Sequence, residues 1–291
     1  MSETELKLSM TPANLDRAGG WLSTKGAVEQ GAPLELLNRY YDTPDGALNR
    51  ERVALRVRAT GSGYIQTLKT QGQLQGAALA RKEWEWPRPE ASLDLTLLDD
   101  TPMAGHPALA HLEPVFDTDF QRRVLMLDWS GNGQWARIEC ALDDGVIRAG
   151  GREQPLCELE LELVEGEPAV LAHVATALTQ SVPALLNSIS KAEQGYYLAG
   201  IGTQGELAPG AAPGDWLDAL CRLWLWDDPA GWQSLLHVHR ELSSRAEAAG
   251  ASKAYQGVTA SLEAAAEQGL SPRETLTTLR GLAPLQLALL S

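Results

Sequence analysis

The sequence predicts a mixed α+β protein, an eight-stranded antiparallel closed β-barrel with flanking helices, followed by a small C-terminal α-helical bundle. Two observations support this division. Up to about residue 163, segments with the two-residue alternation of β-strands are joined mostly by short turns, whereas beyond residue 214 apolar residues recur at helical spacing. Strands joined by hairpins favour a closed barrel, because closure removes the exposed edges of the sheet.

Turn signals separate the expected strands. Thr43-Pro44-Asp45-Gly46 follows the second strand, and the glycine-containing turns at 61–63 and 131–133 join neighbouring strands as hairpins. Helices are expected between the strands, near residues 11–20, 91–99, 104–112, 167–180 and 183–197. The expected strands cover residues 3–9, 34–43, 53–59, 64–70, 80–86, 115–128, 134–142 and 156–164.

The C-terminal third of the chain has a different pattern. Residues 202–214 are rich in Gly, Pro and Ala and are expected to form a linker between a domain of residues 1–201 and a helical domain of residues 215–291. Ser271 followed by Pro272 and Glu274 is typical of a helix start. The expected helices cover residues 216–226, 231–249, 252–268 and 271–290.

Composition limits the classes of function. The 291 residues carry a formal net charge of −14, which argues against a broad nucleic-acid-binding surface. No apolar stretch reaches the ~18 residues of a membrane span, and the acidic N-terminus does not resemble a secretory signal. Cys140, Cys157 and Cys221 show no pairing or metal-ligand spacing. We therefore expect a cytoplasmic protein with no nucleic-acid or membrane partner.

Charged residues fall on one face of at least six of the expected strands. In the strand 53–59, for example, Arg56 and Arg58 share a face opposite Leu55 and Val57. These faces could meet solvent around an apolar interior, or they could line the interior of the barrel. Periodicity alone leaves both orientations open. The helices between the strands favour the inward one, because they need an apolar exterior to cover.

An interior with both signs of charge suits few ligands. Rows of Lys and Arg favour a polyanion, and arginine matches the geometry of phosphate oxygens. Buried carboxylates would repel that polyanion unless a hard divalent cation such as Mg²⁺ lay between them. The combination indicates metal-dependent phosphoryl chemistry on a compact polyphosphate.

The same residues resemble the motifs of the CYTH proteins, the triphosphate tunnel metalloenzymes. Glu3-Thr4-Glu5-Leu6-Lys7 is similar to the N-terminal Glu-x-Glu-x-Lys signature of that family. The resemblance continues in order to about residue 200. The further motifs lie at residues 38–44, 55–58, 66–69, 81–85, 118–122, 141–143, 158–162 and 190–196.

The resemblance implies a tunnel that binds triphosphate with one or two Mg²⁺ or Mn²⁺ ions. Catalytic roles are implied for Glu5, Lys7, Glu160 and Lys191. The implied metal ligands are Glu3, Glu5, Asp143, Glu158, Glu160 and Glu162. The implied substrate-binding residues are Lys7, Arg56, Arg58, Lys69, Arg81, Arg122 and Lys191.

Other charged residues are expected outside these sets. Glu83 and Glu85 are expected to pair with tunnel cations, and strand parity turns Arg39 and Arg123 away from the lumen.

Within the family, the residues 67–69 and 81–85 and the helical extension look most like bacterial inorganic triphosphatases. The expected function is metal-dependent hydrolysis of inorganic triphosphate to diphosphate and phosphate. A thiamine triphosphatase, a class IV adenylyl cyclase and a non-catalytic polyphosphate-binding module are the alternatives. The expected partner is a small-molecule triphosphate. A homodimer through Trp226 and Trp232 remains an alternative to their packing in the bundle core.

The helical extension departs from the histidine-rich CHAD domain that such enzymes often carry. It contains only His237 and His239 and is too short for a complete CHAD domain, so its role stays open.

Overall fold

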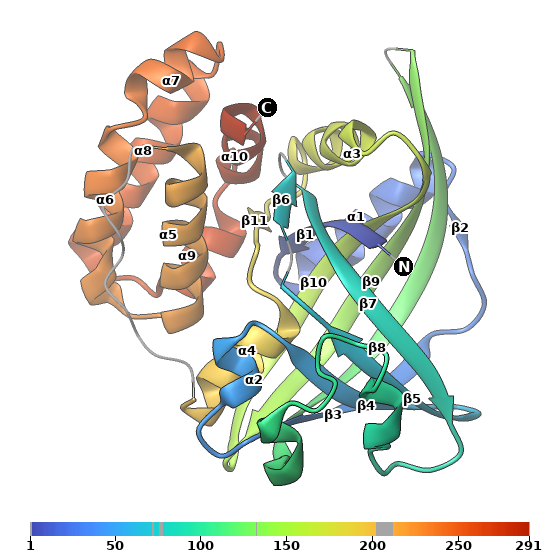
Figure 1. Ribbon diagram of the computed structural model, residues 1–291. Coiled ribbons are helices and arrows are strands. Elements are labelled where there is room, and N and C mark those ends of the chain that lie inside the picture. Colours follow the sequence, from blue (N-terminus) through green and yellow to red (C-terminus); the bar gives the residue numbers. More distant parts are fainter. Residues whose placement is uncertain (1, 72, 76–77, 132, 202–211, 291) are drawn as a thin grey trace.

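The computed structural model describes residues 2–71, 73–75, 78–131, 133–201 and 212–290, and the side chains of residues 2, 3, 73–75 and 79–81 lie outside that description. Its core element is one antiparallel sheet flanked by helices (Figure 1). Eight strands make up most of the sheet. They are β1 (Ser2–Ser9), β3 (Leu34–Asp42), β4 (Ala54–Thr60), β5 (Gly63–Lys69), β7 (Ala78–Arg88), β8 (Glu113–Gly131), β9 (Gln134–Ala149) and β10 (Arg152–Gly166).

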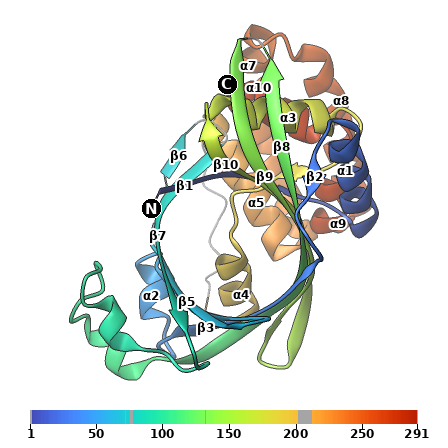
Figure 2. The same cartoon turned by 90° about the vertical axis from the view of Figure 1, so that its right-hand side faces the viewer.

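The strands pair in the order β1-β10-β9-β8-β3-β4-β5-β7, and β1 pairs again with β7 where Ser2–Glu5 lies opposite Leu79–Lys82. The eight strands therefore pair in a circuit, which Figure 2 views along its axis. The short strands β2 (Val28–Glu29), β6 (Gln73–Gln75) and β11 (Leu185–Leu186) pair with β8, β7 and β1. The α+β class and the antiparallel sheet are confirmed. The predicted number of eight strands is wrong, because the described residues contain eleven.

Buried leucines show which face of the sheet points outward to the helices. Leu6 and Leu8 of β1 and Leu159 and Leu161 of β10 are buried in one core with α1 (Pro12–Thr24) and α3 (Ala169–Thr179). A second core lies outside β4 and β5, under α2 (Ala47–Arg50), η1 (Leu95–Leu98) and η2 (Pro107–His111). The apolar faces thus point outward to helices, and the prediction that the charged faces point inward is confirmed.

Two helix predictions need correction. The helix expected at 183–197 begins only at Lys191, because Leu185–Leu186 pairs as β11 with β1 and the amide N–H of Asn187 donates to the carbonyl of Lys7 at 3.0 Å. The helix α4 (Lys191–Ala199) then starts at a capping box formed by Ser190 and Glu193. The helices expected near 91–99 and 104–112 are the short 3₁₀ turns η1 and η2.

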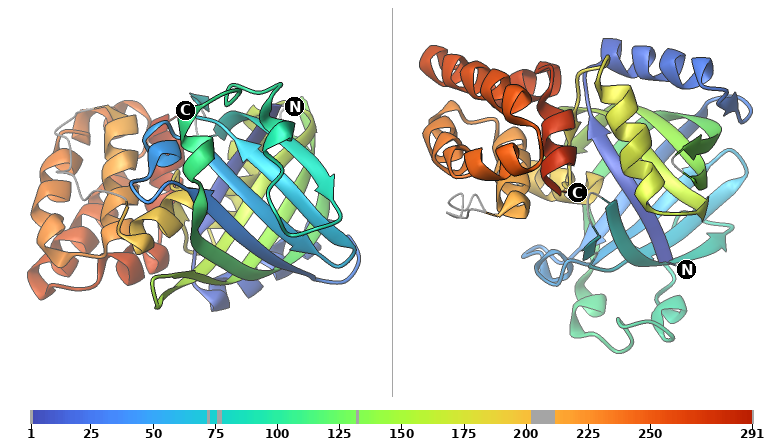
Figure 3. Two further views of the ribbon diagram at one scale, coloured as in Figure 1. Left: turned by 60° about the horizontal axis from the view of Figure 1, so that its bottom comes forward. Right: turned by 90° about the horizontal axis from the view of Figure 1, so that it is seen from above.

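Beyond Ala212 the described chain is helical and packs on one side of the sheet (Figure 3). The predicted helix at 231–249 is divided after Arg240, and the one at 271–290 is divided at Leu279–Gly281. The predicted cap at Ser271 is confirmed, since its Oγ accepts the Glu274 N–H at 3.2 Å. The helices are α5 (Pro213–Trp226), α6 (Trp232–Arg240), α7 (Ser243–Ala248), α8 (Ser252–Gln268), α9 (Pro272–Thr278) and α10 (Leu282–Leu290), with the short turn η3 (Pro229–Gly231).

The helical region shares its core with the sheet. Trp216 and Leu220 of α5 and Leu285 of α10 belong to the same buried cluster as Leu8 of β1. Trp232 is buried in this cluster and Trp226 is half-buried against it, which favours core packing for both; the homodimer stays a prediction. Residues 202–211 of the predicted linker lie outside the described residues.

Two predictions from composition can be compared with the structure. No helix among the described residues has both the length and the apolar character needed to cross a bilayer. The three cysteines are unpaired, and burial raises the pKa of Cys140 to about 12, which keeps its thiol protonated at neutral pH.

Candidate active site

A cavity of about 750 Å³ lies inside the strand circuit. Charged side chains from β1, β4, β5, β7, β8, β9 and β10 line it, together with residues of α4 and α5. Nine of the predicted site residues lie in this lining. They are Glu5, Lys7, Arg56, Arg58, Lys69, Arg122, Glu160, Glu162 and Lys191.

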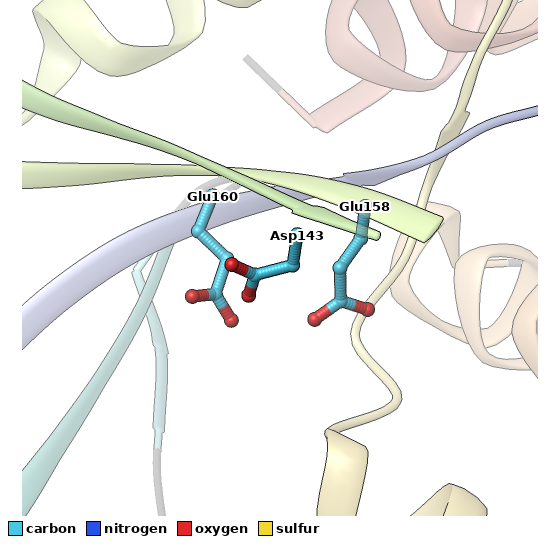
Figure 4. A group of neighbouring side chains, drawn as sticks. All are labelled: Asp143, Glu158 and Glu160. Atoms are coloured by element: carbon cyan, nitrogen blue, oxygen red, sulfur yellow. The ribbon is translucent and has the colours of Figure 1, made fainter. Parts of the chain in front are cut away.

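Three carboxylates form a tight group at one wall, where Glu160 lines the cavity and the buried Asp143 and Glu158 lie beside it. Glu158 of β10 lies directly opposite Asp143 of β9 in the sheet, and Glu160 follows Glu158 on the same face of β10. Their side chains project to the same side of the two strands (Figure 4), and an oxygen of each lies within 4.8 Å of the others. Because antiparallel register fixes which side chains face each other, the strand pairing itself assembles the acidic group.

Two cations hold this acidic group together. The Lys191 Nζ lies 2.8 Å from an oxygen of both Asp143 and Glu160 and also contacts Glu158. Arg122 of β8 forms two parallel hydrogen bonds to Asp143, at 2.7 and 2.6 Å, and contacts Glu160 at 2.5 Å. The group is therefore a buried ion network of three carboxylates and two cations.

Burial and ion pairing oppose each other in this network. Burial acts to lower the pKa of Lys191, but Asp143, Glu158 and Glu160 outweigh it and raise that pKa above its ordinary value. Burial raises the pKa of Glu158, with Lys191 opposing it. Burial would also raise the pKa of Glu160, but Lys191 and Arg122 outweigh it and hold that pKa well below its usual range.

The acidic group fits a divalent cation. Three carboxylates with converging oxygens offer the hard donors that Mg²⁺ and Mn²⁺ prefer. Asp143 and Glu158 are almost fully buried, so their charges need counter-ions, and a divalent cation would add to those that Lys191 and Arg122 supply. Of the six predicted metal ligands, this group contains Asp143, Glu158 and Glu160.

The opposite wall of the cavity is basic. Arg56 and Arg58 of β4 point inward, and each contacts a polar residue of β3. The Arg58 Nε donates to Asn38 Oδ1 at 2.8 Å, and the Arg56 Nη1 contacts the Tyr40 hydroxyl at 3.4 Å. The Nε of Arg56 is buried without a hydrogen-bond partner in the described part of the chain. A buried donor in this condition is costly unless a ligand supplies an acceptor.

Carboxylates of β7 neutralise only part of the basic wall. Glu83 lies 2.9 Å from Lys69 and 3.9 Å from Arg56, and Glu85 lies 4.0 Å from Arg56, which confirms the predicted pairing with tunnel cations. Burial, together with repulsion from Arg56 and Arg122, lowers the pKa of Arg58 to about 10. This wall therefore has a deficit of negative charge, which an anionic ligand would relieve.

Lys7 connects the site to the segment that carries Lys191. Its Nζ donates to the carbonyl of Ile189, and its backbone carbonyl accepts the Asn187 N–H. The chain is thereby held along β1 until Ser190 caps α4, which places Lys191 at the first position of the helix. The Lys191 side chain reaches the acidic group from this position.

Three further pairs of residues singled out in the sequence differ in where the structure places them. Glu5 and Glu162 lie directly opposite each other on β1 and β10 and line the cavity. The backbones of Glu3 and Arg81 belong to β1 and β7, and their side chains lie outside the description. The prediction that two arginines face outward is confirmed: Arg39 pairs with Asp117 at 2.9 Å and Arg123 with Glu29 at 3.0 Å.

Sequence reasoning missed several residues of the site. Asn38 and Tyr40 share the inward parity that excludes Arg39, so strand alternation could have identified both. Glu139 lines the cavity because it lies opposite Glu162. Asp218 and Arg222 of α5 also line it, and no local pattern could have found them, because their position depends on how the helical region packs.

An acidic group that fits a divalent cation, opposite a basic wall in which the Arg56 Nε has no partner among the described residues, defines a site for a polyanion. The sequence model of the CYTH domain matches residues 1–196, and the chain belongs to the CYTH domain family. The resemblance seen in the motifs is thereby confirmed.

One curated relative is similar to about two thirds of this chain. The inorganic triphosphatase of Haemophilus influenzae is 32% identical over 200 residues, which cover 68% of this chain and 55% of the relative. The chain thus matches only about half the length of that protein.

Two solved structures are similar to part of this chain. HpAC1 from Hippeastrum carries a provisional adenylyl cyclase name and has a dominant triphosphatase activity; it is 17% identical, with a TM-score of 0.49 over 67% of this chain and 95% of its own. The Mimivirus capping enzyme triphosphatase is 12% identical, with a TM-score of 0.35 over 62% of this chain and 90% of its own.

Proposed function

We propose that this chain hydrolyses inorganic triphosphate to diphosphate and phosphate with the help of Mg²⁺ or Mn²⁺. The observation that carries the proposal is the contrast between the two walls of the cavity. On one side Glu160 lines the cavity beside the buried Asp143 and Glu158, and on the other the Arg56 Nε has no partner among the described residues and the pKa of Arg58 is lowered. A triphosphate coordinated by a divalent cation satisfies both walls at once, and the name of the Haemophilus influenzae relative supports this substrate.

In this proposal the chain supplies binding and charge stabilisation. Arg56, Arg58 and Lys69 would hold phosphate oxygens from the basic wall, and Lys7, Arg122 and Lys191 would do so from the acidic side. A bound divalent cation would polarise a phosphate oxygen and stabilise negative charge as it develops. Phosphoryl transfer asks for little covalent work, so rigid placement of these residues on paired strands is the main contribution.

Several side chains have more specific proposed roles. Asp143, Glu158 and Glu160 would hold the cation, with Glu3, Glu5 and Glu162 as further proposed ligands. Lys191 and Arg122 would keep Glu160 ionised, because both contact it directly. We assign these roles to residues 1–201 as the triphosphate-binding domain, joined through residues 202–214 to the helical domain of residues 215–291.

The test is phosphate release by the purified chain from tripolyphosphate, ATP and thiamine triphosphate, with MgCl₂ or MnCl₂. We expect tripolyphosphate to be the best substrate and EDTA to abolish turnover. Glu160→Gln removes a cation ligand, and we expect its kcat/KM to fall about 1000-fold, equivalent to ~4 kcal/mol of transition-state stabilisation. Glu165→Gln, an exposed glutamate of the same strand, is the matched control and should act as wild type.

The basic wall is tested with Arg58→Gln. Loss of a charge-assisted hydrogen bond worth ~1.5–3 kcal/mol should raise KM about 10- to 100-fold. Arg39→Gln on the neighbouring strand, which faces outward, should leave KM unchanged. Faster turnover of ATP or thiamine triphosphate would replace the proposed substrate. Binding of all three without turnover would indicate a polyphosphate-binding module instead.

A further inference from the structure

The cavity is not enclosed by the sheet and α4 alone. Its lining includes Asp218, Arg222, Leu225 and Trp226, all from α5 of the helical region. Figure 1 shows α5 beside α4, on the side of the sheet where the helical region packs. A region without an assigned role therefore supplies part of the wall of the candidate active site.

Specific contacts fix α5 at this place. The Ser188 N–H donates to the Sγ of Cys221 at 3.4 Å, so α5 contacts the segment that leads to Lys191. The side chain of Gln286 of α10 bonds both the N–H and the carbonyl of Leu186, each at 2.9 Å. Gln286 and Cys221 are fully buried, which makes these contacts part of the core rather than of a mobile surface.

Arg222 is the cation that α5 brings to the cavity. Its Nε bonds Asp218 at 2.6 Å, one helical turn earlier, and its side chain is 38% exposed. The hydrogen bond to Asp218 raises the pKa of Arg222, and the charge of Glu193 in α4 adds to this effect. The terminal Nη groups have no hydrogen bond to the described part of the chain. They are donors of a residue that lines a cavity already adapted to an anion.

We propose that Arg222 binds the substrate anion directly and that the helical region is in this way part of the active site. The inference rests on the proposed function, because it takes triphosphate as the ligand. Arg222 would contact the part of the triphosphate nearest α5 through its Nη groups, while Asp218 orients the guanidinium through Nε.

The test measures the Kd of sodium tripolyphosphate for the full chain by calorimetry in EDTA, so that it does not depend on turnover. Arg222→Gln should raise the Kd about fivefold, a modest effect because the side chain is partly exposed. Arg222→Lys keeps the charge and should recover part of the affinity. Arg240→Gln is the matched control: Arg240 is an exposed arginine of α6 paired with Glu263 at 3.1 Å, and its loss should leave the Kd unchanged.

The Asp218→Asn background separates binding from a structural role. If Arg222 binds the anion directly, Arg222→Gln still raises the Kd when Asp218 is already neutral. If Arg222→Gln no longer changes the Kd in this background, Arg222 acts only through its ion pair, and the inference is overturned. An unchanged Kd in the single variant Arg222→Gln would overturn it as well. A wild-type chain that binds triphosphate but releases no phosphate contradicts the proposed function and leaves the binding result to decide on Arg222.

Discussion

The ion network at the wall of the cavity and the core of the helical region are both buried, but ionisable side chains have opposite charge states in the two places. Lys191 keeps its charge inside the circuit, because three carboxylates outweigh the effect of burial. His239 of α6 is fully buried, and burial lowers its pKa to about 4, with the nearby charge of Glu263 opposing the shift and that of Arg240 adding to it. The partners of a buried group, rather than burial alone, decide whether it is charged.

The two sites also differ in how well their hydrogen bonds are satisfied. His239 bonds the Thr259 hydroxyl through Nε2 at 2.8 Å and stacks on Tyr255, and its Nδ1 has no partner in the described part of the chain. A neutral imidazole tolerates this arrangement, whereas a charged one would have only Glu263 near it, and that carboxylate already pairs with Arg240. The helical core therefore acts as a support, and the charged interior of the sheet is the part suited to binding ions.

The largest effect on stability is expected when the charge of Lys191 is removed from the buried ion network. Lys191→Met leaves the three buried carboxylates with Arg122 as their only cation among the contacts described above. Removal of one partner from a buried ion network typically costs ~3–5 kcal/mol, and we expect the free energy of unfolding at pH 7 in EDTA to fall by about that amount. Urea denaturation measures it.

Lys253→Met is the control for this change, because Lys253 is exposed on α8. A loss in Lys191→Met as small as that of the control would show that the carboxylates do not depend on the ammonium.

A smaller effect is expected at His239. The unfolded chain protonates this histidine below its ordinary pKa of about 6.5, whereas the folded chain does so only near pH 4. The unfolded state therefore binds more protons between these values, and stability contributed by the neutral imidazole is lost as the pH falls. Between pH 7 and pH 4.5 we expect the wild type to lose about 2 kcal/mol more than His239→Gln in urea denaturation.

His237 provides the matched control, because it lies on the exposed face of the same helix. His237→Gln should lose stability in parallel with the wild type. Equal losses in the wild type and His239→Gln would mean that the buried histidine is not held neutral, and the contrast between the two regions would fail.

The sequence could predict the charged interior because strand alternation is a local property. Arg56 and Arg58 point inward and Leu55 lies in the outer core, as the two-residue period requires. The ends of β9 and β10 could not be predicted, since the polar run around Asp143 and Asp144 breaks the alternation. At Gly145 a Cβ would lie 2.2 Å from the carbonyl oxygen of Asp119, so close packing against β8 requires this glycine.

Other parts of the site depend on contacts between distant residues. The segment before Lys191 is extended because β11 pairs with β1 and because Gln286, 100 residues further along the chain, bonds Leu186. The pattern of residues 183–190 could not predict these contacts, because it carries no information about distant partners. For the same reason, the motif resemblance could identify Lys191 as a site residue but could not show that Arg222 would lie in the same cavity.

The smallest effect on stability is expected at the exposed ion pair of Arg39 and Asp117. Comparison with a buried pair of the same geometry tests whether burial determines the strength of an ion pair. Arg39 bonds Asp117 from the neighbouring strand through Nε and Nη2, at 2.9 and 3.1 Å, and Arg122 bonds Asp143 in the same geometry. Each arginine lies directly opposite its aspartate in the sheet. The first pair faces solvent, with 52% of the Arg39 side chain exposed, whereas the second faces the cavity.

Because solvent screens the outer pair, we expect Arg39→Ala to change the free energy of unfolding by no more than ~1 kcal/mol in urea denaturation. Arg122→Ala, measured in the same way, should cost several times as much, since it leaves Asp143 buried without one of its two cations. Equal costs would show that the bidentate geometry, which both pairs share, sets their strength. A large difference between the two costs would show that burial sets the strength of the pairs. Burial is also the property that distinguishes the interior of the sheet from its outer surface.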